Sequence, residues 1–243
     1  MINTDLASSL KSTYQLGNPY PHIIFDNFLP QDIAKQTFIE LSNHNNWAWD
    51  DMSGYSESEK LAQVNKWWTP WDSESKTILS NLPVTWKCLE YFNSKQFLLF
   101  LEELTGIENL IPDVDFEGGG VHKITNEGRL ELHSDYNKHP NPEKDMWRRI
   151  NLLLYLTPDW KYNGDLELWN KDPLTHIKTI SPQFNRAVIF NTTDEAIHGH
   201  PTPLVCPTDV SRYSFALYYF TKDRPEEEKS DSTAAIWYDS TYL

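Results

Sequence analysis

Hydrophobic and polar positions alternate in two different ways along this chain of 243 residues. In the first half, the hydrophobic spacing is typical of helices, and we predict one helix over 30–41 and another over 94–105, ending at Gly106. A short strand is predicted after the turn at 19–21. The stretch 42–77 is polar, acidic and rich in tryptophan, and we expect little regular structure there.

From residue 118 onward, short hydrophobic segments separated by turn residues predict a series of strands. These strands are expected at 121–125, 129–135, 148–156, 165–169, 174–180, 186–190 and 211–220. Short strands at this spacing are typical of a sandwich or barrel. A helix-rich part ahead of an all-β part favours a jelly roll with N-terminal helices packed on one face. We therefore predict an α+β, mainly β fold, and a single domain over 1–243, because no linker divides it.

Charge and composition narrow the classes of partner. Lys and Arg number 21 and Asp and Glu number 35, which gives a formal net charge of −14. Binding to phosphates needs clustered cations, so we expect neither nucleic acid nor an anionic membrane surface as a partner. No apolar run approaches the roughly 20 residues of a membrane span. With two cysteines and no secretory signal, a cytoplasmic protein with free thiols is expected.

The strand over 129–135 carries a candidate metal site. Its alternation places His133 and Asp135 on the same face, two residues apart, which suits two ligands of one ion. A His-x-Asp triplet alone is more often a pair of surface or core residues. His198, 65 residues later, is the candidate third ligand. Two histidines and a carboxylate form the triad of non-haem Fe(II) oxygenases, although a zinc hydrolase uses the same set.

A second candidate feature opens the apolar strand over 211–220. Arg212 and Ser214 share one face of that strand. A guanidinium is a planar fork for a carboxylate, and burying it without a partner would be costly. Alone, Arg212 could equally form a surface salt bridge. Together with the His and Asp residues, it favours the binding of a carboxylate ligand.

These motifs resemble the 2-oxoglutarate- and Fe(II)-dependent dioxygenase superfamily, nearest its prolyl-4-hydroxylase-like branch. The resemblance covers about residues 116–224. In chain order it rests on Gly118-Gly119-Gly120-Val121-His122, Leu132-His133-Ser134-Asp135-Tyr136-Asn137, Arg149-Ile150-Asn151, Asn163-Gly164-Asp165, Phe190-Asn191-Thr192-Thr193, His198-Gly199-His200-Pro201 and Ser211-Arg212-Tyr213-Ser214. It implies a cupin-like double-stranded β-helix over 118–224, preceded by a helical, variable part over 1–117 and followed by a tail over 225–243.

The resemblance also implies cofactors and their ligands. Fe(II) would be bound by His133, Asp135 and His198, and 2-oxoglutarate and O2 would be co-substrates, with ascorbate as a possible reductant. The 2-oxoglutarate carboxylate would be bound by Arg212, Ser214, Tyr155 and Asn151, although Tyr155 could instead be a core aromatic. His200 faces the same way as His198 if the chain is extended, so either could be the ligand, and the family pattern favours His198.

The resemblance favours hydroxylation of an unactivated C–H bond, in peptidyl or free proline, with release of succinate and carbon dioxide. The substrate is therefore expected to be a small molecule or a peptide. Alternatives are a dioxygenase acting on another amino acid or metabolite, and a non-catalytic jelly-roll binding module. The candidate substrate contacts are His122, Tyr136, Asn137, Trp67, Trp71 and His200. The sequence does not predict an oligomeric state.

Arginine and tryptophan are distributed unevenly. All six arginines lie after residue 120, whereas six of the ten tryptophans lie within 47–86. We predict that part of 42–90 forms a rim or lid of the active site, although these tryptophans could simply pack helices on the sheet. The apolar tail residues 236–238 are expected to dock on the body. The acidity favours a neutral or cationic substrate.

Overall fold

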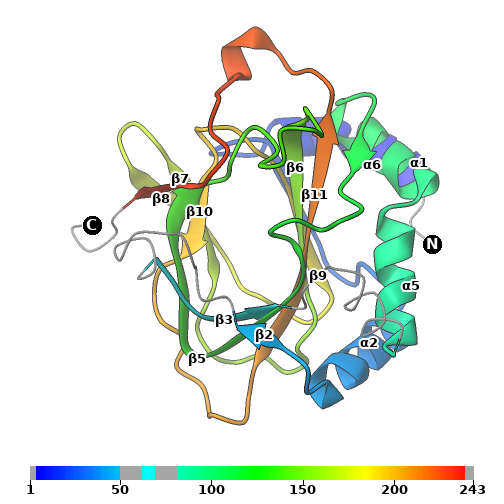
Figure 1. The fold of residues 1–243 in the computed structure, drawn as a ribbon, viewed down its shortest axis with the longest axis vertical. Coiled ribbons are helices and arrows are strands. Elements are labelled where there is room, and N and C mark those ends of the chain that lie inside the picture. Colours follow the sequence, from blue (N-terminus) through cyan, green and yellow to red (C-terminus); the bar gives the residue numbers. More distant parts are fainter. Residues whose placement is uncertain (1–3, 50–61, 69–80, 239–243) are drawn as a thin grey trace.

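Antiparallel strands and a layer of helices build the computed structural model, which describes residues 4–49, 62–68 and 81–238 (Figure 1). The helices are α1 (Thr4–Gln15), α2 (Gln31–Asn43), α5 (Pro83–Phe92) and α6 (Lys95–Thr105), with a 3-10 turn at Glu226–Glu228. The strands are β1 (His22–Phe25), β2 (Ala48–Trp49), β3 (Gln63–Trp68), β4 (Ile111–Pro112), β5 (Gly120–Ser134), β6 (Trp147–Tyr155), β7 (Leu166–Asn170), β8 (Thr175–Ile180), β9 (Arg186–Asn191), β10 (Ile197–His200), β11 (Arg212–Thr221) and β12 (Ile236–Tyr238).

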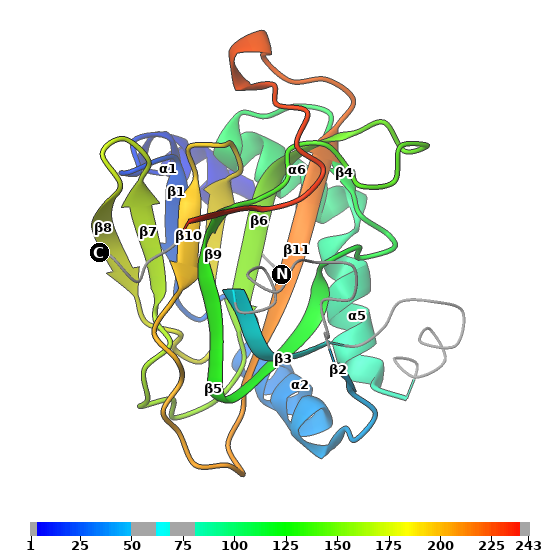
Figure 2. The same cartoon turned by 60° about the vertical axis from the view of Figure 1, so that its left-hand side comes forward.

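The main strands form one curled sheet in the order β1-β9-β6-β11-β5-β10-β7-β8. Its two halves face each other, and β5 joins them because its first part pairs with β11 and its last part with β10 (Figure 2). The predicted mainly β fold with N-terminal helices on one face is confirmed. None of the helices in the described ranges has the length and apolar character that a membrane span requires.

The long strand β5 corrects one prediction. We expected a turn at 126–128 between two strands, but the chain continues as one strand through a local kink. Glu127 adopts a positive φ of 63°, and a side chain at Gly128 would place its Cβ 2.4 Å from Cγ2 of Ile124. These turn-forming residues therefore bend β5 from one half of the sheet into the other instead of reversing it.

Alternation along β6 and β11 separates the core from the site. Leu152 on β6 and Phe215 on β11 face the helices and belong to the main hydrophobic core. Asn151 and Ser214, one residue away on each strand, face the space between the two halves of the sheet. β6 and β11 are therefore hydrophobic on the side that faces the helices and carry both polar and apolar residues on the side that faces the pocket.

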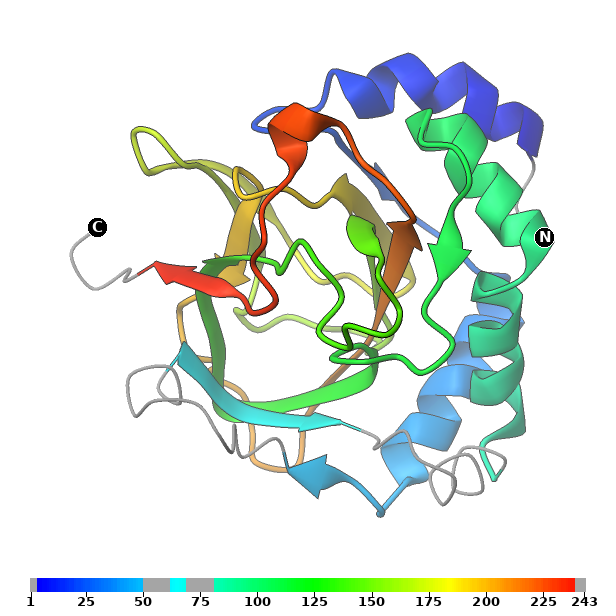
Figure 3. The same cartoon turned by 45° about the horizontal axis from the view of Figure 1, so that its top comes forward.

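The helices cover the outer face of the half sheet that contains β6 and β11 (Figure 3). Helix α6 matches its prediction closely: Ser94 caps its first turn by accepting a hydrogen bond from the Phe97 amide, and Gly106 ends it at φ 79°. Phe97 and Phe92 meet edge to face with ring centres 4.9 Å apart. Each buried phenylalanine contributes about 1.5–3 kcal/mol of hydrophobic stabilisation.

Two segments that are far apart in the sequence cover the outer edge of β5. β3 pairs with it between His122 and Leu130, and β12 pairs with it between Leu132 and Ser134. The predicted docking of the tail is therefore confirmed, with β12 as its strand. β2 and β3 form short strands inside the stretch expected to lack regular structure, and most of the remainder of that stretch lies outside the described residues.

Candidate active site

Two histidines and one aspartate meet where β5 ends. His133 on β5 lies opposite His198 on β10, and Asp135 follows the last residue of β5. Nε2 of His133 is 3.6 Å from Oδ1 of Asp135, and Nε2 of His198 is 3.7 Å from its Oδ2. One ligand atom from each residue lies within 4.8 Å of the others, and all three residues are buried. The structure thus brings the three predicted ligands into an arrangement that suits a single metal ion.

Hydrogen bonds turn both imidazoles toward this centre. Nδ1 of His133 is 2.9 Å from the carbonyl oxygen of Glu131, and Nδ1 of His198 is 3.0 Å from that of Ala196. A carbonyl can only accept, so each Nδ1 donates and each Nε2 presents a lone pair to the cluster. Burial and the neighbouring His133 lower the pKa of His198 to about 4. His198 is therefore neutral at pH 7, as a metal ligand must be.

The carboxylate of Asp135 is fixed by two further side chains. Arg148 donates to its Oδ2 at 2.7 Å, and Nδ2 of Asn151 donates to the same oxygen at 3.2 Å. Burial alone would raise the pKa of Asp135, but the charge of Arg148 and the imidazoles outweigh this effect and hold it below its usual value. The side chain of Asn151, which we expected to bind 2-oxoglutarate, thus donates a hydrogen bond to Asp135, a predicted metal ligand.

Arg212 lies at the other end of the same pocket. It is 5% exposed, one of its terminal nitrogens donates to the Gly164 carbonyl, and its guanidinium carbon is 5.7 Å from the centre of the Tyr155 ring. Among the described residues no salt bridge to it is found, and its Nε has no hydrogen-bond partner. A buried, unpaired guanidinium is costly, so a carboxylate ligand fits this position.

A pocket of about 410 Å³ extends from the His–Asp–His cluster to Arg212. Tyr155, Asn151 and Ser214 line it, and the backbone of Ser214 pairs with both Tyr155 and His122. This volume is typical of sites for small molecules. The structure therefore places the four residues predicted to bind 2-oxoglutarate around one cavity.

His200 lines this pocket without joining the cluster. A register shift follows His198, so His200 lies opposite Leu130. Gly199 permits this close approach, because a Cβ there would lie 2.7 Å from the Glu131 carbonyl oxygen. Neither ring nitrogen of His200 has a hydrogen-bond partner in the described ranges. Burial and the charge of Arg212 hold its pKa well below the usual value, so a ligand bound beside Arg212 would meet a neutral ring.

The other predicted substrate contacts divide into two groups. His122 and Tyr136 line the pocket, and burial and then the charge of Lys66 hold the pKa of His122 well below its usual value. Asn137 instead bonds to Asp194 and Arg224, which tie down neighbouring loops.

The two tryptophans among these candidates are placed only in part. Trp67 lies on β3, where its backbone pairs with that of Lys123, and Trp71 lies outside the described residues. Trp47 and Trp86 pack against the main core, as in the alternative of simple packing. Gln63 and Lys66, from the same stretch of sequence, line the pocket.

Arg148 is a site residue that the sequence analysis missed. Strict alternation along β6 would place Arg149, rather than Arg148, on the face of Asn151. On β11, Tyr219 pairs with Ile150, but the next residue, Phe220, pairs with Arg148. This register shift leaves Arg149 as a bulge and turns Arg148 inward. The guanidinium carbon of Arg148 is also 3.4 Å from the centre of the Tyr218 ring. A bulge has no clear signal in a single sequence, and this pairing was therefore hidden.

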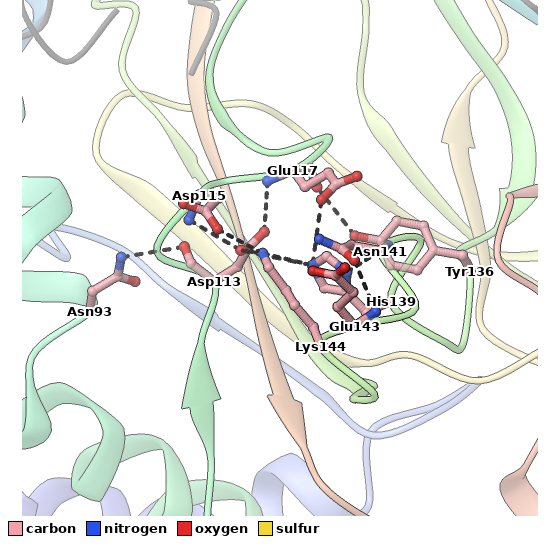
Figure 4. Close-up of polar contacts among 9 residues, drawn as sticks. All are labelled: Asn93, Asp113, Asp115, Glu117, Tyr136, His139, Asn141, Glu143 and Lys144. Carbon is pink, nitrogen blue, oxygen red and sulfur yellow. Dashed lines mark hydrogen bonds and ion pairs between the residues drawn. The ribbon is translucent and has the colours of Figure 1, made fainter. Parts of the chain in front are cut away.

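A polar network holds together two loops at the mouth of the pocket (Figure 4). Nζ of Lys144 lies 3.1 Å from Oδ1 of buried Asp113 and 3.0 Å from Oδ2 of Asp115. Asp113 also accepts from the amide of Glu117 at 2.6 Å, and the Tyr136 hydroxyl donates to the Glu117 carbonyl at 3.2 Å. Glu117 and Tyr136 line the pocket, so this network sets the position of its rim.

A two-histidine, one-carboxylate cluster inside a curled β-sheet is the ligand arrangement of non-haem Fe(II) oxygenases. The comparisons with known proteins agree with this class. The model of the 2OG-Fe(II) oxygenase superfamily matches residues 119–220, which contain all three cluster residues and Arg212. This match and the His–Asp–His cluster support an oxidoreductase of the 2OG-Fe(II) oxygenase type, for which Fe(II) and 2-oxoglutarate are implied. No curated protein matches it in a sequence search.

Solved structures share the fold at low sequence identity. A prolyl hydroxylase from Trichoplax adhaerens, in complex with a hypoxia inducible factor peptide fragment, is 18% identical, with a TM-score of 0.56 over 90% of this chain and 91% of that one. A 2OG-Fe(II) oxygenase family oxidoreductase from Burkholderia pseudomallei is 8% identical, with a TM-score of 0.51 over 91% of each chain. The likeness supports the double-stranded β-helix fold.

Proposed function

We propose that this protein is an Fe(II)- and 2-oxoglutarate-dependent hydroxylase of prolyl residues, in a peptide or as free proline. The observation that carries the proposal is the buried cluster of His133, Asp135 and His198 in one pocket with the buried Arg212, which forms no ion pair within the described residues. When bound, iron and 2-oxoglutarate supply the O2-dependent oxidation of an unactivated C–H bond, with release of succinate and carbon dioxide. Ascorbate is the proposed reductant for the iron.

In this proposal the three cluster residues hold the iron, and the backbone carbonyls behind the histidines fix their orientation. Arg148 and Asn151 hold Oδ2 of Asp135, which leaves Oδ1 as the oxygen for the metal. No side chain has to act as a nucleophile. The protein supplies ligand geometry, a buried site and the placement of the substrate.

The co-substrate would be bound at the Arg212 end of the pocket. The guanidinium of Arg212 would pair with the distal carboxylate, and the hydroxyls of Ser214 and Tyr155, which line the same pocket, would donate to it. His200, whose ring nitrogens are unpartnered among the described residues, can donate or accept beside the same carboxylate. The pairing would compensate the cost of burying Arg212.

Two observations support a prolyl substrate. The metal end of the pocket is walled by Tyr136, Tyr218, Ala216 and Trp237, an aromatic and apolar surface that suits a pyrrolidine ring. The Trichoplax structure of similar fold holds a peptide. We further propose that part of 42–90, including Gln63 and Lys66, forms the rim of this pocket. The buried free thiols of Cys88 and Cys206 support a cytoplasmic location.

The test combines two assays. Protein supplied with Fe(II), 2-oxoglutarate and a panel of proline peptides and free proline should form succinate and give a product heavier by one oxygen atom. His133→Ala should abolish both signals, whereas His176→Ala, at an exposed position on β8, should retain them. Succinate formation that persists in His133→Ala would overturn the proposed site. Oxidation of other amino acids, but not of proline, would overturn the substrate class.

A further inference from the structure

A segment near the C-terminus runs along the pocket. Residues 224–238, here called the C-terminal strap, leave the sheet after β11 and return to β5 as β12. The strap is anchored in its middle, where the Ser232 carbonyl accepts hydrogen bonds of 3.0 Å from the amides of Asn137 and Lys138. At its start, buried Arg224 donates to the Thr192 carbonyl at 2.6 Å. Three separate attachments therefore hold the strap in one path.

This path places the strap against the metal end of the pocket. Thr233, Ala234, Ala235 and Trp237 all line the cavity. Trp237 pairs through its backbone with His133, and the centre of its ring lies 5.0 Å from that of the His133 imidazole. The indole Nε1 is buried and has no hydrogen-bond partner in the described part of the chain. The neighbouring Tyr238 is not among the residues that line the cavity.

Resting on the proposed function, we infer that Trp237 determines substrate specificity: its indole forms the wall against which the reacting residue is held beside the metal. The ring already contacts one predicted metal ligand, so a substrate atom near the metal must pass within reach of it. A bulky, rigid indole limits the size of the ring that fits and keeps water from that side. The small residues Ala234 and Ala235 leave space for a peptide beside it.

The experiment compares the wild type with Trp237→Ala, Trp237→Phe and the matched control Tyr238→Ala, which truncates the next aromatic on the same strand. The probes are two tripeptides that differ only in their central residue, proline or its six-membered-ring homologue pipecolic acid, read out by the gain of one oxygen atom. One extra methylene in a fitted pocket changes kcat/KM by about tenfold or more. The quantity compared is the kcat/KM for the pipecolic acid tripeptide divided by that for the proline tripeptide. Trp237→Ala should raise this ratio about tenfold, Trp237→Phe should raise it by less, and Tyr238→Ala should not change it.

An unchanged ratio in Trp237→Ala, with the KM for 2-oxoglutarate also unchanged, would overturn the inference. A second measurement separates it from the proposed function. If the wild type oxidises neither tripeptide, proline in this tripeptide is not its substrate, and succinate release without any substrate then tests Trp237. An open wall should raise this uncoupled release about threefold or more in Trp237→Ala but not in Tyr238→Ala; equal rates would overturn the role of Trp237. Circular dichroism and thermal melting establish that each variant is folded.

Discussion

Arg148 donates a hydrogen bond of 2.7 Å to Oδ2 of Asp135, and both side chains are buried. This pair connects the edge of the metal cluster to the inner face of β6. The guanidinium carbon lies 3.4 Å from the centre of the Tyr218 ring and 4.6 Å from that of Tyr136, and these contacts restrict its movement away from the carboxylate. The geometry makes Arg148 the residue that orients Asp135.

Replacing Arg148 should therefore weaken metal binding. Residues that support a metal ligand typically contribute 10–100-fold to affinity, and we expect a loss of about that size in Arg148→Met. Calorimetric titration with Co(II) in place of Fe(II) measures it directly. Arg149→Met is the control, because Arg149 points to Thr221 and Glu228 instead of the cluster. Equal Co(II) affinities in the wild type and a folded Arg148→Met would contradict the orienting role.

Substitution of the two histidines of β10 should have different effects, one on metal binding and the other on 2-oxoglutarate binding. His198→Ala removes a cluster residue and should reduce Co(II) binding at least 100-fold, since only two protein ligands remain. His200→Ala leaves the cluster intact and should keep the metal, but it should raise the KM for 2-oxoglutarate because its ring lies beside Arg212. The opposite result, with metal lost in His200→Ala and kept in His198→Ala, would reassign the distal ligand.

The sequence was sufficient for features that depend on alternation and on local signals. The strand containing His133, the helix between Ser94 and Gly106, and the docking of the tail all followed from residue patterns. Features that depend on register were not predictable. The bulge at Arg149 turns Arg148 inward, and the pairing of Trp237 with His133 joins residues more than 100 positions apart. Such contacts are set by the tertiary fold, and a single sequence carries no local signal for them.

Stability should depend on pH through His22 on β1. This buried ring donates from Nδ1 to the Tyr20 carbonyl at 2.8 Å, and its Nε2 lies 2.8 Å from the Lys178 ammonium. Burial and then the charge of Lys178 lower the pKa of His22, although the Tyr20 bond opposes them. The unfolded chain, with a His pKa of about 6.5, therefore binds more protons than the folded one in mildly acid solution.

A lowered folded pKa contributes stability above about pH 6.5, and this stability is lost as the pH falls. Urea unfolding should give a lower free energy of unfolding at pH 5 than at pH 7, and His22→Gln should make this difference smaller. The control is His176→Gln, an exposed histidine on β8, the strand that carries Lys178. A pH dependence identical in the wild type and His22→Gln would contradict this assignment.

Asp113 should stabilise the pocket rim far more than its neighbour Asp115. Both carboxylates bind Lys144, but Asp113 is 2% exposed, accepts from the amide of Glu117, and leaves a buried gap when truncated. We expect Asp113→Ala to lower the free energy of unfolding by about 2–4 kcal/mol, because the amide and Lys144 lose a buried partner. Asp115→Ala should cost less than about 1 kcal/mol, since its side chain is half exposed. Urea unfolding measures both, and equal losses would show that burial does not govern this network.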